Sequence, residues 1–166
     1  EPSPECTCES SITTIEANKT YGCTDANGNG TCSYNVGNSQ ILICDVKALI
    51  NTNQFSCGST NSKLVIDNGG DLTINGYTNT SGTRSNIIVK KGGSLAITGT
   101  GSNKALFDVK SNSIASKIYG NLILDQKPNI SKPLQRIIVF STATIIIDGT
   151  TYTGTDSTSQ SQSLLE

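Results

Sequence analysis

Three stretches of the chain share one pattern of apolar and polar positions. Residues 64–77 read LVIDNGGDLTINGY, residues 87–100 read IIVKKGGSLAITGT, and residues 137–150 read IIVFSTATIIIDGT. Each begins with three apolar residues, breaks briefly, and then carries Leu or Ile at alternating positions before a glycine. Alternation with period two is typical of a β-strand with one buried face. Each stretch therefore predicts two short strands joined by a turn.

Parts of the same unit occur elsewhere in the chain. Residues 41–50 resemble a degenerate unit, residues 106–109 resemble its first strand, and residues 120–125 resemble its second strand. On this interpretation the first strands begin near residues 41, 64, 87, 106 and 137. The two best-matched units are offset by 23 residues, from residue 64 to residue 87.

A repeat of this length, built only of short strands and turns, is typical of a solenoid, because stacking buries the apolar face that one unit cannot bury alone. We predict an all-β fold, a parallel β-helix (β-solenoid) of about five coils. An antiparallel β-sandwich is the alternative, since short strands with frequent turns also fit it. The fixed offset favours the solenoid. It predicts apolar ladders of Leu72/Ile74, Leu95/Ile97, Leu122/Leu124 and Ile145/Ile147, and it places Asp67 beside Lys90.

All six cysteines lie within the first 57 residues. An even number in one segment predicts three disulfides and an oxidising compartment. We favour a local Cys44–Cys57 bond and leave the other pairings open, except the strained Cys6–Cys8 ring. A zinc site or reduced cytosolic thiols are the alternatives, but the chain has no His and no C-x-x-C pair for zinc. The cysteines are Cys6, Cys8, Cys23, Cys32, Cys44 and Cys57.

These features predict one structural domain with three parts. Residues 1–57 form a disulfide-stapled N-terminal cap leading into the first coil. Residues 58–155 form the solenoid coils, and residues 156–166 are interpreted as a flexible tail or linker.

At residues 41–150 the repeated units resemble the coils of right-handed parallel β-helices, as in pectate-lyase-like folds and adhesin-type surface proteins. The resemblance implies an architecture and no particular activity, because that fold carries enzymes, adhesins and structural rods. It also implies what an enzyme would need, namely a calcium-binding acidic cluster with an Arg or Lys base, or several Asp residues.

Charge and hydropathy argue against nucleic acid as a partner and against a membrane span. Twelve basic and thirteen acidic residues give a net charge of −1, with no basic stripe of the kind that binds nucleic acid. No apolar run approaches the roughly 20 residues of a membrane span. The chain has only two arginines, Arg84 and Arg136, and Asp67 and Asp71 flank a glycine break rather than forming a pair. We therefore predict no catalytic residue and no cofactor.

One segment is a weak candidate for calcium. Asp25, Asn27 and Asn29 alternate before a glycine, as at the start of an EF-hand loop, but Val36 occupies the twelfth position, where a Glu is required. A hairpin turn at Asn-Gly-Asn-Gly is the simpler interpretation. We predict no other metal site.

Two further sets of residues are candidates for surface roles. Tyr77, Tyr119 and Tyr152 could stack on a ligand, or they could be amphipathic residues at coil corners. The N-glycosylation acceptors are Asn18, Asn29, Asn79 and Asn129. Four acceptors are about what chance gives in a chain so rich in Asn, Ser and Thr.

The leading functional hypothesis is an extracellular, non-enzymatic recognition or adhesion domain, such as the ectodomain of a cell-surface receptor or glycoprotein. It would present a solenoid face to a glycan or protein ligand. The alternatives are a polysaccharide-acting β-helix enzyme or its degenerate relative, and a structural subunit of a filament or wall that self-associates through the solenoid ends.

Overall fold

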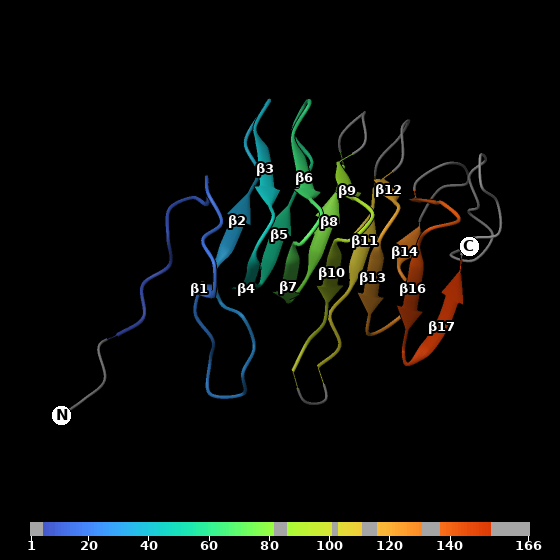
Figure 1. Ribbon diagram of the computed structural model, residues 1–166. Coiled ribbons are helices and arrows are strands. Elements are labelled where there is room, and N and C mark those ends of the chain that lie inside the picture. Colours follow the sequence, from blue (N-terminus) through green and yellow to red (C-terminus); the bar gives the residue numbers. More distant parts are fainter. Residues whose placement is uncertain (1–4, 82–85, 101–102, 111–115, 131–136, 154–166) are drawn as a thin grey trace.

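The computed structural model describes residues 5–81, 86–100, 103–110, 116–130 and 137–153, so the predicted tail at 156–166 lies outside the described residues, as do Arg84 and Arg136. Within these ranges the chain forms seventeen strands and no helix. It winds into a parallel β-solenoid of about four turns (Figure 1). The predicted fold class is confirmed. No helix in the described residues is long and apolar enough to cross a membrane.

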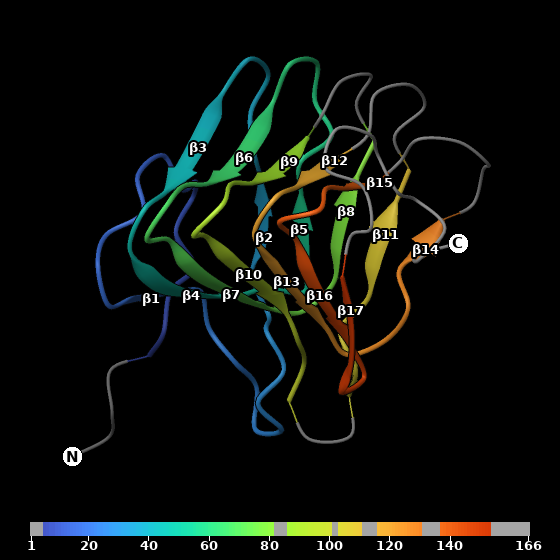
Figure 2. The same cartoon turned by 45° about the vertical axis from the view of Figure 1, so that its right-hand side comes forward.

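Three sheets run along the solenoid, and Figure 2 shows them as its sides. Sheet 1 contains β1 (Lys19–Tyr21), β4 (Lys47–Asn51), β7 (Asp71–Asn75), β10 (Ser94–Ile97), β13 (Asn121–Leu124), β16 (Thr144–Ile147) and β17 (Thr150–Thr153). Sheet 2 contains β2 (Ser33–Asn35), β5 (Gln54–Ser56), β8 (Thr78–Thr80), β11 (Phe107–Val109) and β14 (Asn129–Ile130). Sheet 3 contains β3 (Ile41–Cys44), β6 (Lys63–Ile66), β9 (Ile87–Val89), β12 (Ser116–Ile118) and β15 (Ile137–Val139).

The predicted apolar ladders form the core beneath sheet 1. Parallel pairing places Leu95 between Leu72 and Leu122, and all three side chains are inaccessible to solvent. A second ladder runs beside it and consists of Ile50, Ile74, Ile97, Leu124 and Ile147. Burial of each such side chain contributes about 2 kcal/mol before chain entropy is counted.

Each coil has three strands, whereas the sequence pattern indicated two. The third strand belongs to sheet 2, where Thr78 and Thr80 are fully buried and their hydroxyl oxygens have no hydrogen-bond partner among the described residues. These polar residues concealed the strand from a hydrophobic pattern. The prediction that residues 106–109 form a first strand is also wrong, because the apolar Phe107 and Val109 belong to the sheet 2 strand of that coil. β11 pairs with β8 in sheet 2, and β12 supplies the sheet 3 strand of that coil.

The stacked strands begin at Lys19, inside the segment predicted as a cap. β1 and β2 pair in parallel with β4 and β5 of the next coil. Residues 5–18 precede the first strand, and Ile12 and Ile15 from this segment are buried in the core cluster. The cap is therefore shorter than predicted, and it closes the end of a coil that residues 19–44 already form.

Two disulfides, Cys6–Cys23 and Cys8–Cys32, tie this short cap to the first coil. Between them, the Glu9 carboxylate accepts hydrogen bonds from the Tyr34 hydroxyl and the Gly22 N–H. Burial opposes ionisation of Glu9, but these hydrogen bonds outweigh it and hold the pKa of Glu9 below its usual range. Disulfides favour an oxidising, extracellular setting.

The predicted Cys44–Cys57 disulfide is wrong, because both residues are buried free thiols. Cys44 ends β3 opposite Ile66, whereas the Cys57 thiol donates to the Asn86 carbonyl, which also accepts from Leu64 N–H at the start of β6. Cys57 therefore lies near the start of β6 and Cys44 lies beside its end, so about one strand length, roughly 10 Å, separates the two cysteines. A disulfide needs Cα atoms within about 7 Å.

The turns between sheets 3 and 1 also match the prediction. Gly69 and Gly92 adopt φ of 86° and 84°, which favours glycine. The outer surface beside them carries the expected ion pair, with Lys90 Nζ 3.8 Å from Asp67 Oδ1. Both side chains are about half exposed, so this pair contributes less than about 1 kcal/mol.

Replacement of Leu95 by alanine tests the ladder. We expect Leu95→Ala to lower the free energy of unfolding by about 3 kcal/mol, because it leaves a cavity between Leu72 and Leu122. Ser94→Ala, on the outer face of the same strand, should change it by less than about 0.5 kcal/mol. Urea unfolding followed by circular dichroism measures both. Equal effects from the two variants would contradict the inward placement of Leu95.

The free thiols give a second test. Burial raises the pKa of both thiols, that of Cys57 to about 12, so little reactive thiolate exists at neutral pH. Native protein should therefore react slowly with iodoacetamide, and protein unfolded without reductant should gain two adducts in its intact mass. Unfolded protein that gains none would show that a third disulfide forms.

Candidate functional site

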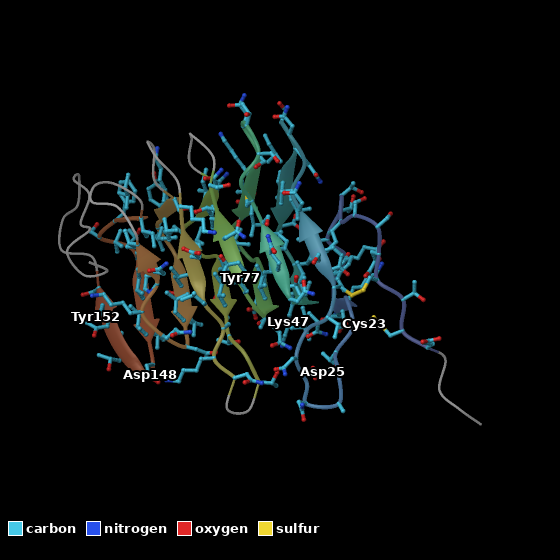
Figure 3. All side chains as sticks on the ribbon, turned by 180° about the vertical axis from the view of Figure 1, so that it is seen from behind. Cys23, Asp25, Lys47, Tyr77, Asp148 and Tyr152 are labelled. Atoms are coloured by element: carbon cyan, nitrogen blue, oxygen red, sulfur yellow. A yellow bond between two sulfur atoms is a disulfide. The ribbon has the colours of Figure 1, made fainter. Side chains whose placement is uncertain are left out.

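The three tyrosines singled out from the sequence lie in different settings. Tyr77 follows β7, and its hydroxyl donates to Asp108 Oδ2 at 2.7 Å. Burial, aided by this hydrogen bond, raises the pKa of Tyr77. Tyr152 lies in β17 opposite Ile145 and packs against the core. Figure 3 shows Tyr152 and Asp148 towards one end of the molecule, and Asp25 and Cys23 towards the other.

Tyr119 lies in the setting most suited to a ligand. It follows β12 at the edge of a surface hollow of about 540 Å³, here called the basic hollow. Its ring stacks on Phe140 with centroids 4.0 Å apart and planes 12° apart. The lining of the basic hollow consists of Ile88, Lys90, Lys91, Lys117, Tyr119 and Thr142.

Strand register explains how these residues meet. Ile88 pairs with Lys117, and Ile118 pairs with both Val89 and Val139. The residues that follow these strands, Lys90, Tyr119 and Phe140, are therefore neighbours on successive coils. Phe140 covers one face of the Tyr119 ring, and Tyr119 borders the hollow together with Lys90 and Thr142. The Thr142 hydroxyl donates to the Tyr119 carbonyl at 2.7 Å and fixes this corner.

The charge at the basic hollow is unbalanced. Lys90 has Asp67 as a partner, whereas Lys91 and Lys117 make no ion pair with another described residue. Lys91 is exposed and Lys117 is half-buried. The hollow therefore presents ammonium donors beside an aromatic face and the apolar side chain of Ile88.

A second hollow, of about 390 Å³, lies beside Tyr77, and four of its twelve lining residues are asparagines. The side-chain amides of these asparagines are hydrogen-bonded within the protein. Asn103 Nδ2 donates to Asn29 Oδ1 at 2.9 Å, and Asn75 Nδ2 donates to the Gly28 carbonyl at 3.0 Å. These contacts join the 24–30 loop to Asn103 and to the end of β7, so they serve the packing of that loop.

The weak calcium candidate forms a hairpin turn. Thr24 and Gly30 make an antiparallel bridge, and Asp25 Oδ1 accepts from the N–H groups of Asn27 and Asn29 at 2.8 and 3.0 Å. The hydrogen bonds from Asn29 and then Asn27 lower the pKa of Asp25. The carboxylate thus faces backbone donors, an arrangement that favours the hairpin interpretation.

Other potential ligand groups are separated. Asp67 contacts Asn68 N–H and Lys90 at a corner, while Asp71 begins β7 on the outer face. Among the described residues, one group of three His, Cys, Asp or Glu side chains is close enough to hold a metal ion. It consists of Cys8, Cys23 and Cys32, whose sulfurs are already in disulfides.

The glycosylation acceptors differ in access. Asn18 is exposed, whereas Asn79 is buried, with 7% of its surface accessible. The side-chain amides of Asn29 and Asn129 are engaged with Asp25 and Asp108, respectively. A glycan would therefore be accommodated most readily at Asn18.

The basic hollow was not evident from the sequence as one site. The Lys90–Lys91 pair and Tyr119 were each visible, but the 23-residue offset did not relate them. In sheet 1, Ser94 pairs with Asn121, 27 residues later, because this coil contains a longer connection. Lys117 and Tyr119 align with the strand of Lys90 only when the extra residues of that connection are counted.

Comparisons with family models, with curated proteins and with solved structures found no match to this chain. The description as a parallel β-solenoid rests on the repeat and on the strand register.

Proposed function

We propose that this protein is an extracellular, non-enzymatic recognition domain that binds a glycan on the outer face of sheet 3. The observation that carries the proposal is the Tyr119 ring, which stacks on Phe140 and lines the basic hollow beside three lysines. The apolar face of a sugar ring can stack on such an aromatic surface while its hydroxyls accept hydrogen bonds from lysines.

The platform is built on paired strands. Tyr119 and Lys117 extend from β12, which pairs on both sides with β9 and β15. A site whose groups are held by strands loses little conformational entropy on binding. The basic hollow is shallow, which suits a sugar at the surface of a larger glycan.

The setting supports the same proposal. Two disulfides suit secretion or display at a cell surface. The resemblance of the repeated units to adhesin-type β-helices supports a role in adhesion. An accessible Asn18 would suit a glycoprotein.

Removal of the tyrosine ring tests the proposal. A glycan array probed with the oxidised protein should give a defined set of bound glycans. Tyr119→Ala should lower binding at least tenfold, because the stacking surface is lost. Tyr152→Ala is the matched control, since Tyr152 lies in β17 outside the hollow, and it should bind as the wild type does. An array on which the protein binds nothing, or on which both variants bind normally, would refute this function.

A second candidate function, self-association, is favoured by the edge strand β3. Ile41 and Ile43 are the large apolar side chains most exposed in the described residues, at 54% and 50%. Gln40 and Cys44 direct their carbonyls to β6. The alternation of parallel pairing therefore turns the N–H and C=O groups of Ile41 and Ile43 towards the open edge.

This edge is complementary to itself. In an antiparallel pair of two β3 strands, Ile41 of one copy would lie opposite Ile43 of the other, and both backbones would gain hydrogen bonds. β3 contains no proline or charge to prevent such pairing. The occupant we expect is thus a second copy of this chain.

Sedimentation at about 100 μM measures this association. The wild type should form dimers, and Ile43→Lys should be monomeric, because a charge at the edge opposes pairing. Leu49→Lys, on the outer face of β4 within sheet 1, is the control and should still dimerise. A monomeric wild type would show that β3 does not mediate association.

A further inference from the structure

We propose that the sugar bound at the basic hollow is anionic, with a carboxylate or sulfate held by Lys91 and Lys117 while its ring stacks on Tyr119. This inference rests on the proposed glycan-binding function and adds the charge of the ligand to it.

The first argument is the local excess of positive charge. The basic hollow gathers three ammonium groups, and Asp67 is the one described carboxylate paired with any of them. Elsewhere, Lys19, Lys104 and Lys110 each lie 3.4 Å from a carboxylate oxygen. Lys47 and Lys63 make no ion pair with another described residue, but they lie on different strands, β4 and β6, and do not gather at one hollow. The whole chain carries a net charge of −1, so the excess at the hollow is a local feature.

The second argument is spacing. Ile88 and Lys117 are direct partners on neighbouring strands, and Lys90 and Tyr119 follow them two residues later. Strands lie about 4.8 Å apart and alternate residues about 6.6 Å apart, so these four positions outline a rectangle. Its size is that of one sugar ring. Lys90 and Lys117 occupy opposite corners, roughly 8 Å apart, and Lys91 follows Lys90.

The third argument is the combination of apolar and charged groups. Ile88 and the ring of Tyr119 give the hollow an apolar floor and wall, along which the lysine side chains can pack their methylene groups. Reduced hydration there strengthens a charge-assisted hydrogen bond to an anionic oxygen. A neutral sugar would use the stacking surface and leave the ammonium groups without an anionic partner.

Binding of matched oligosaccharides to the intact oxidised chain tests the inference. The probes are a hexuronate oligomer, a sulfated oligosaccharide and a neutral oligomer of the same length, measured by calorimetry at two salt concentrations. At least one acidic probe should bind ten times more tightly than the neutral one, and its affinity should fall as salt rises. The stronger acidic probe identifies which anionic group is recognised.

Substitutions locate the effect. Lys91→Gln and Lys117→Gln should each weaken acidic binding roughly fivefold, since each removes one charge-assisted hydrogen bond at a partly solvated site. Neutral binding should fall by less than about twofold, because the glutamine amide can still donate to a sugar hydroxyl. Lys47→Gln, which changes an exposed lysine on β4 in sheet 1, is the matched control and should have no effect. Thermal unfolding confirms that each variant is folded.

The possible outcomes separate the two proposals. Equal affinity for neutral and acidic probes, with Tyr119→Ala still weakening both, would overturn the anionic ligand and keep glycan binding. Acidic binding unaffected by either lysine substitution would also overturn it. Binding of anionic lipid vesicles or acidic peptides with no binding of any glycan would overturn both proposals.

Discussion

The in-register stacking of strands from one coil to the next is the constraint on which the rest of the structure depends. The same register that joins backbone N–H and C=O groups also aligns Leu72, Leu95 and Leu122 in the core. A slip of one residue would turn these side chains to the surface, so the core holds the register in place. The outer positions are then fixed as well. Asp67 contacts Lys90, and Ile88 pairs with Lys117, because the inward-facing residues of the same coils are aligned in the core.

A stack of this kind has ends, and the chain treats them differently. At the first coil, two disulfides and the buried Ile12 and Ile15 hold a covering segment in place. At the last coil, β17 folds back antiparallel on β16 and covers the edge of sheet 1. β3 in sheet 3 has no such cover among the described strands. The exposure of Ile43 there follows from the unequal treatment of the edges.

The sequence predicted the parts of the fold that have a periodic apolar pattern. The ladders in sheet 1 and the Asp67–Lys90 contact were predictable because alternation and a fixed offset specify them. Sheet 2 was not, since buried Thr78 and Thr80 look like surface residues. The error over Cys44 and Cys57 has a related cause. In a solenoid, residues about half a coil apart lie at different corners, while residues a whole coil apart are neighbours. The residues that line the basic hollow come from neighbouring coils. The longer connection before β11 concealed from the sequence pattern that they lie side by side.

The corner between sheets 3 and 1 shows why the site occurs where it does. The equivalent positions on successive coils are Asp45, Asp67, Lys90, Tyr119 and Phe140, in that order along the axis. The corner thus changes from acidic to basic to aromatic. A cation and an aromatic ring are neighbours at one step of this series, between Lys90 and Tyr119, and Phe140 then supports the ring from the far side. Because these side chains lie outside the apolar ladders, their chemistry can change from coil to coil without disturbing the core. Along the described part of this corner the solenoid therefore places a basic and an aromatic residue side by side at one step, and we propose that recognition occurs there.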